Sequence, residues 1–265
     1  MTLSGVLSAV NVDIGTSITS FDGANDTLTN TGGLTSWTAG WTPGTIFSGQ
    51  DFTTLGVSEI SFAHAAGTWG ATDDFSYAVF DGITISTGMS NNYFTNDNFS
   101  EASFIGSTFD LYGNQPFLQV DLTNANFTGA IINYNSYLAS TGKQNVNLFR
   151  DADLDGADFT NTTFNLDITG TDVNILEGFF GSGDINLSGA VFNFSGNAAH
   201  IDAAAAHILS TLTSTDTYDQ DFYDNNFETF GFTDASSFAA AVPEPSSLVL
   251  ITMGSLLVVA QRKKK

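Results

Sequence analysis

The sequence predicts a mainly β protein whose chain winds into a solenoid, followed by a capping helix and an apolar helix at the C-terminus. Three observations predict this fold class. Apolar residues, mostly aromatic, recur every five positions through the middle of the chain, a helical stripe of apolar residues follows, and an uncharged run near the end precedes four basic residues. The 265 residues are enough to bury a large core.

The five-residue spacing is clearest in the segment NYFTNDNFSEASFIGSTFDLY, which places Phe94, Phe99, Phe104 and Phe109 in one series. Neither a helix nor a flat strand returns to the same face after five residues, so the chain must turn a corner in each unit. The further series are Phe117, Leu122, Phe127, Ile132 and Tyr137; then Phe149, Leu154, Phe159 and Phe164; and finally Leu187 and Phe192.

Small residues accompany these apolar centres. Ala102, Ala125 and Ala157 each stand two positions before a centre, and strand alternation turns them inward beside it. Units such as ANFTG and ADLDG resemble the pentapeptide-repeat family, with Phe in place of Leu at most centres. The resemblance implies a right-handed, quadrilateral β-helix with one coil for every four units. The alternative from the residues alone is a β-sandwich in which the spacing is accidental.

For the regions between and around the repeats, the sequence predicts only their general character. We expect the breaks at 110–116, 138–146 and 165–184 to be loops at corners of the coil. The Thr-, Ser- and Gly-rich N-terminal region is expected to be β, either extending the solenoid or capping it. The predicted divisions are an N-terminal β region at 1–90, a pentapeptide-repeat-like β-helix at 91–196, a capping helix at 197–215, an acidic linker at 216–242 and a C-terminal segment at 243–265.

The predicted capping helix rests on Ile201, Ala205, Ile208 and Leu212, which form one helical stripe, with Asn197 as its N-cap. A helix in this place would cover the last edge of the solenoid.

The end of the chain has three parts in a fixed order. Pro243, Glu244 and Pro245 break any helix, residues 246–260 carry no charge, and a basic stop follows. The basic stop consists of Arg262, Lys263, Lys264 and Lys265. On hydropathy alone the uncharged run also fits a buried core helix, because it is short for a membrane span.

This order resembles the PEP-CTERM sorting signal of exported bacterial proteins. The resemblance implies export, transient anchoring in the inner membrane by the C-terminal helix, and processing by exosortase near Pro243, Glu244 and Pro245. It also implies association with exopolysaccharide, biofilm or the cell surface. Exported proteins begin with a signal peptide, and the opening residues lack its basic region, so we expect the natural start to lie upstream.

The charge distribution limits the partners. Residues 1–261 hold two basic residues against all 28 acidic ones, a net charge of −26. Such a body repels nucleic acid and attracts cations. The chain has no cysteine, which excludes disulfides and thiol chemistry.

One weak metal candidate stands out. Asp151, Asp153 and Asp155 match the opening of a calcium loop, but Thr162 occupies the twelfth position, where that loop needs Glu. The repeat register explains the same aspartates as a polar face of the coil. His200 and His207 share a helical face without a nearby carboxylate, and His64 has no partner in sequence, so we expect no histidine metal site.

No catalytic or cofactor-binding motif occurs, so the expected protein is not an enzyme and has no cofactor. Two functions remain. The first is an exported cell-surface or matrix protein with exosortase as a transient partner and exopolysaccharide or divalent cations as further partners. The second is an acidic rod that mimics DNA and binds an enzyme such as gyrase, as some pentapeptide-repeat proteins do. The C-terminal signal favours the first.

Overall fold

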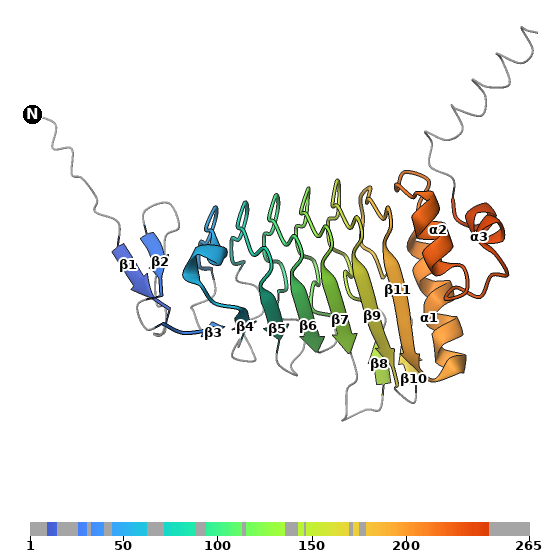
Figure 1. Cartoon of the computed structure of the whole chain (residues 1–265), viewed down its shortest axis with the longest axis horizontal. Helices are drawn as coiled ribbons and strands as arrows, with labels where there is room; N and C mark the ends of the chain where they lie inside the picture. Colours follow the sequence, from blue (N-terminus) through green and yellow to red (C-terminus); the bar gives the residue numbers. More distant parts are fainter. Residues whose placement is uncertain are drawn as a thin grey trace, which may run out of the picture.

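The computed structural model places most of the chain in one elongated body (Figure 1). The residues that the structure describes are 10–14, 26–30, 33–39, 44–62, 72–87, 94–112, 115–135, 143–145, 147–169, 172–174 and 179–243.

The body is built on a seven-stranded parallel sheet in which each strand pairs with the strand one turn further along the chain. In spatial order its strands are β3 (Ser36–Ala39), β4 (Glu59–Phe62), β5 (Thr84–Thr87), β6 (Thr108–Tyr112), β7 (Ile131–Asn135), β9 (Thr163–Ile168) and β11 (Val191–Gly196).

Two further columns of parallel bridges run beside this sheet. One joins Ile46, Asp74, Asn98, Asp121, Asp153 and Ser182, and the other joins Asp51, Val79, Ser103, Asn126, Asp158, Asn186 and Thr217. Successive turns of the chain therefore stack in parallel along several tracks. This arrangement is a β-solenoid, which confirms the predicted class and excludes the β-sandwich.

The corners have a repeated hydrogen-bonded geometry. The Ala102 N–H donates to the Phe99 carbonyl at 3.0 Å, and the Ser107 N–H donates to the Phe104 carbonyl at 3.1 Å. Glu101 and Gly106, at the third position of these turns, have φ of 59° and 65°. A positive φ at this position belongs to the type II turn and favours Gly or Asn. The polar residues after each centre thus form the predicted corners.

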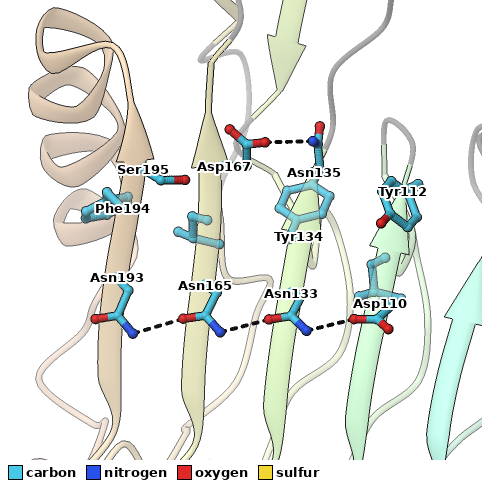
Figure 2. A pocket seen from close by; sticks show the side chains of 12 residues that line it. Asp110, Tyr112, Asn133, Tyr134, Asn135, Asn165, Asp167, Asn193, Phe194 and Ser195 are labelled. Atoms are coloured by element: carbon cyan, nitrogen blue, oxygen red, sulfur yellow. Dashed lines mark hydrogen bonds between the residues drawn. The ribbon is translucent and has the colours of Figure 1, made fainter.

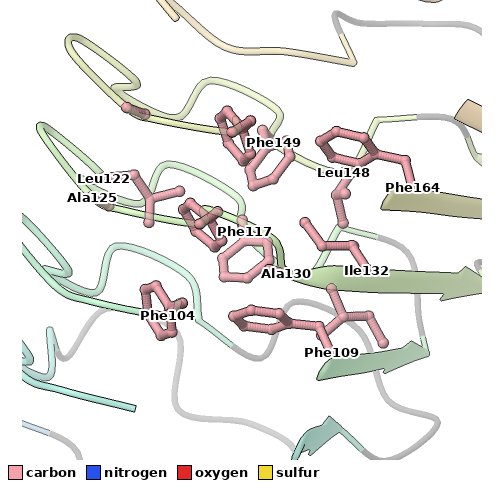
Figure 3. Close-up of a cluster of buried hydrophobic side chains, with 14 of the residues drawn as sticks. Phe104, Phe109, Phe117, Leu122, Ala125, Ala130, Ile132, Leu148, Phe149 and Phe164 are labelled. Atoms are coloured by element: carbon pink, nitrogen blue, oxygen red, sulfur yellow. The ribbon is translucent and has the colours of Figure 1, made fainter. Parts of the chain in front are cut away.

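The apolar centres point into one shared interior. Phe94, Phe99, Phe104 and Phe109 are each at most 2 % exposed, and their rings contact one another in sequence. Figure 3 shows this packing across neighbouring turns. Rings at corresponding positions also stack along the axis, with centroids 4.4 to 5.2 Å apart, in the column Phe52, Phe80, Phe104, Phe127 and Phe159. Each of the three longer series follows one turn of the solenoid, except that Tyr137 lies outside the described residues, and Leu187 and Phe192 belong to the next turn.

The N-terminal region extends the solenoid, since β3, β4 and β5 belong to the same sheet as the repeats. The short 3-10 helix η1 (Phe52–Leu55) lies within it and is capped by the Asp51 side chain. Before these elements, β1 (Val10–Asp13) and β2 (Asp26–Thr29) form a separate parallel pair.

The predicted corner loops contain more strand than the sequence indicates. Strand β9 continues to Ile168, inside the predicted loop at 165–184, because Leu166 and Ile168 both alternate into the core. Strands β8 (Lys143–Asn145) and β10 (Asp172–Asn174) arise from two of these breaks and pair in parallel as a small second sheet.

Three helices close the C-terminal end of the solenoid (Figure 1). They are α1 (Ala198–Thr211), α2 (Gln220–Asn226) and α3 (Ala235–Ala241), and we refer to residues 198–242 as the C-terminal cap. The predicted capping helix corresponds to α1, which buries Ala205 and Ile208, and Leu212 is buried directly after its end.

The segment at 216–242, expected to be an acidic linker, instead contains α2 and α3. The difference arises from its aromatic residues. Phe222 and Phe238 are fully buried, and the Phe238 ring lies 5.6 Å from Phe222 and 5.3 Å from Phe230. The acidic residues between them are exposed, and one of them caps a helix: the Asp234 side chain accepts from the Ser237 N–H and begins α3.

Side chains of the cap satisfy the last edge of the solenoid. The buried Asn226 side chain accepts from the Phe192 N–H at 2.8 Å and donates to the Ala190 carbonyl at 2.7 Å. Asp219 accepts from the Gly189 N–H at 2.8 Å. These contacts replace the hydrogen bonds that a further turn would make. The last strand edge therefore exposes fewer unpaired backbone N–H and C=O groups to which another chain could pair.

Candidate functional site

The weak metal candidate lies at a corner of one turn. The Asp155 N–H donates to the Asp153 carboxylate at 3.2 Å, and Asp151 lies 3.5 Å from the Arg150 guanidinium. Among the described residues, no three His, Asp or Glu side chains gather in a way that could hold a metal ion. The Asp153 carboxylate thus accepts a hydrogen bond within its own turn.

Two of the three histidines lie in the C-terminal cap. His200 and His207 both belong to α1, and partial burial lowers the pKa of His207. His64 lies outside the described residues.

The structure reveals a groove that the sequence did not predict. It has a volume of about 330 Å³ and crosses β6, β7, β9 and β11. On these strands Phe109, Ile132, Phe164 and Phe192 face the core, so the residues directly after them face outward. The outward residues form two rows.

The first row is a continuous ladder of hydrogen bonds (Figure 2). Asn193 donates to Asn165 at 2.9 Å, Asn165 to Asn133 at 2.8 Å, and Asn133 to Asp110 at 2.7 Å. Each amide is held by the next strand, which fixes the direction of its oxygen and nitrogen atoms.

The second row lies two residues further along each strand and consists of Tyr112, Asn135, Asp167 and Ser195. Asn135 donates to Oδ2 of Asp167 at 2.8 Å. The other oxygen of this carboxylate, Oδ1, is buried and has no hydrogen-bond partner among the described residues. Leu111, Tyr134, Leu166 and Phe194, which separate the two rows along the strands, complete the lining of the groove.

The sequence does contain a signal for this groove. In each of four turns, the residue immediately after the centre that lies on the sheet is Asn or Asp: Asp110 after Phe109, Asn133 after Ile132, Asn165 after Phe164 and Asn193 after Phe192. In the sequence these residues resemble the rest of the polar skin, and only the register between turns brings them together.

A second polar feature is buried inside the solenoid wall. The Asp97 carboxylate accepts from the Asp73 N–H at 2.9 Å, and its other oxygen, Oδ2, is buried without a partner among the described residues. Burial and the nearby Asp73 carboxylate raise the pKa of Asp97 well above 3.8. Asp73 in turn accepts from the backbone N–H groups of Gly44 and Thr45.

The described part of the chain ends where the sorting signal begins. Helix α3 ends at Ala241, and Val242 has extended geometry (φ −78°, ψ 139°), as expected of a residue before proline. Pro243 is the last described residue, so Glu244, Pro245 and the basic stop lie outside the described residues. None of the helices in the described ranges has the length and apolar character that crossing a membrane requires.

Residues 241–265 match the family model of the PEP-CTERM protein-sorting motif. The chain thus ends in a PEP-CTERM motif. It indicates export with exosortase-dependent sorting at the membrane, as the sequence predicts. No curated protein matches the chain. The motif begins on the last residue of α3, so it overlaps the end of the C-terminal cap and no linker separates the two.

Proposed function

We propose that this protein is a non-catalytic component of the bacterial cell surface or extracellular matrix, delivered by its PEP-CTERM motif and associated with exopolysaccharide. The match at residues 241–265 is the observation that carries the proposal. In this proposal the apolar run at 248–260 anchors the protein transiently in the inner membrane. Exosortase then processes it near Pro243, Glu244 and Pro245.

The position of the motif supports this order of events. The side chains of Asp216, Asp219 and Asn226, which satisfy the edge of the last turn, all precede Pro243. Cleavage near the motif would leave these contacts in place. The released body would therefore remain a capped solenoid.

The shape of the body supports a structural role. We propose that the solenoid is right-handed and four-sided, as in the pentapeptide-repeat family. Four apolar centres fill each complete turn, and the outward residues are free for contact. The net charge of −26 over residues 1–261 would keep the rods apart in solution and attract divalent cations.

Cell fractionation tests the proposal. The full gene, with an epitope inserted in the body, is expressed in wild-type and exosortase-deficient cells. The expected result is a shortened body at the surface of wild-type cells and an uncleaved form at the membrane of deficient cells. Replacement of Pro243, Glu244 and Pro245 with alanine should reproduce the deficient pattern, whereas Glu228→Ala, at an exposed acidic residue of the cap, should not.

An uncleaved protein in the cytoplasm of both strains would refute the surface function. That outcome would favour the alternative, an acidic mimic of DNA. Cleaved protein recovered at the surface of both strains would show that another protease acts, and would refute the role of exosortase.

A further inference from the structure

We propose that the groove across β6, β7, β9 and β11 binds an extended polysaccharide strand that carries no acidic groups. This inference rests on the proposed function and assigns the contact with exopolysaccharide to particular residues. Nothing in the family match concerns this face, because the match covers only residues 241–265.

The periodicity of the groove suits a linear polymer. Its two rows cross four parallel strands, and neighbouring strands in a sheet lie about 4.8 Å apart. A polymer that lies across the strands would meet one side chain of each row at each step. Sugar rings in an extended chain repeat on a similar scale, so consecutive rings can make similar contacts.

The chemistry of the first row suits hydroxyl groups. A carboxamide offers two N–H donors and one acceptor oxygen, and each ladder bond uses only one N–H of Asn133, Asn165 or Asn193. Sugar hydroxyls both donate and accept, so they can bond to either end of an amide. Because the ladder already orients these amides, binding would cost little side-chain entropy.

The second row contains a group that needs a donor. Oδ1 of Asp167 is buried and has no hydrogen-bond partner within the part of the chain that the structure describes, while Oδ2 accepts from Asn135. An unsatisfied buried carboxylate oxygen is unfavourable, so a ligand hydroxyl or amino group that drew the partly exposed Asp167 side chain into the groove would relieve this cost.

Tyr112 supplies a fixed aromatic surface at one end of the second row. Its ring belongs to one of the few large apolar side chains that are exposed, at 41 %, among the described residues. The buried Thr87 hydroxyl accepts from the Tyr112 N–H at 3.0 Å and donates to its carbonyl at 3.3 Å. The backbone of Tyr112 is thus held at the edge of the groove, where its ring can pack against the apolar face of a sugar.

Charge selects against acidic polysaccharides. The described residues that line the groove include Asp110 and Asp167 and no basic residue, and residues 1–261 carry a net charge of −26. Uronic acid or sulfate groups would be repelled, whereas neutral and amino sugars would not. The shared chemistry is therefore a polyhydroxylated chain without negative charge.

Calorimetric titration of the full chain in mild detergent tests this assignment. The probes are cello-oligosaccharides (neutral), glucosamine oligosaccharides (cationic) and oligo-mannuronate (acidic). We expect binding of at least one of the first two and none of the third. The pattern between the first two distinguishes hydroxyl recognition from recognition of amino groups by Asp110 and Asp167.

Variants locate the binding site. Tyr112→Ala should weaken binding by about three- to tenfold, the range that loss of an aromatic contact implies. Asn193→Ala, at the exposed end of the ladder, should weaken it by a similar factor. The matched control is Tyr77→Ala, since Tyr77 is also an exposed tyrosine, at 62 %, and does not line the groove.

Three results would overturn the assignment: no binding of either non-acidic probe, equal binding of oligo-mannuronate, or equal effects of Tyr112→Ala and Tyr77→Ala. Self-association that the groove variants abolish, without glycan binding, would identify a second copy as the occupant instead.

The experiments separate failure of the groove assignment from failure of the proposed function. A protein that reaches the surface without binding any probe refutes only the groove, and a protein that is never exported refutes the function whatever it binds.

Discussion

Replacing Phe127 with alanine tests whether the stacked aromatic column stabilises the solenoid. The ring is fully buried between Phe104 and Phe159, with centroids 4.8 Å away on both sides. Removal of a buried Phe side chain typically lowers the free energy of unfolding by 3 to 5 kcal/mol, so we expect about 4 kcal/mol here. The turns on either side are fixed by their backbone hydrogen bonds, so they cannot move inward to fill the cavity that the substitution leaves, and the loss should not fall below this range.

Urea unfolding followed by circular dichroism measures this loss, and two variants serve as references. Phe127→Leu should cost only about 1.5 kcal/mol, because a leucine already occupies the corresponding position next to Phe159, at Leu187. Ile105→Ala, at a residue that is 43 % exposed, should change stability by less than about 0.5 kcal/mol. A loss at Phe127→Ala no larger than that at Ile105→Ala would refute the stacked core.

Three further predictions concern single polar or glycine positions. The raised pKa of Asp97 means that its contribution to the free energy of unfolding is complete below pH 3.8 and is lost as the pH rises through the higher pKa of the folded state. Asp97→Asn should therefore remove a decrease in that free energy of up to about 1.4 kcal/mol per pH unit. The same pH dependence in variant and parent, measured by urea unfolding at several pH values, would contradict this. Asn226→Ala should cost about 3 kcal/mol by leaving two buried backbone groups unpaired and should speed amide exchange at Phe192. Asn225→Ala, which removes only a 3.5 Å contact with the Gly189 carbonyl, should cost far less and leave the exchange at Phe192 unchanged. Gly156→Ala should be destabilising in thermal melts, because φ is +72° and the added Cβ would lie 2.3 Å from the Asn124 Oδ1 atom; a variant as stable as the parent would show that this corner relaxes freely.

The residues that face the core were predictable because the apolar centres follow one another at a fixed spacing of five residues along the chain. Five residues form one side and one corner, so Phe94, Phe99, Phe104 and Phe109 reveal the turn without knowledge of any other turn. The PEP-CTERM motif was predictable for the same reason: its parts are contiguous. The C-terminal cap was only partly predictable. Helix α1 has an apolar stripe with helical spacing, whereas α2 and α3 are stabilised by the tertiary contact between Phe222 and Phe238.

The amino-acid sequence by itself therefore determined the coil, its aromatic filling and the sorting segment, all of which follow from local spacing. Only the tertiary structure decided which polar residues share a surface. The ladder joins residues separated by 23, 32 and 28 positions, because the insertions between turns differ in length. Register between turns depends on the pairing of whole strands, and no local spacing in the chain records it.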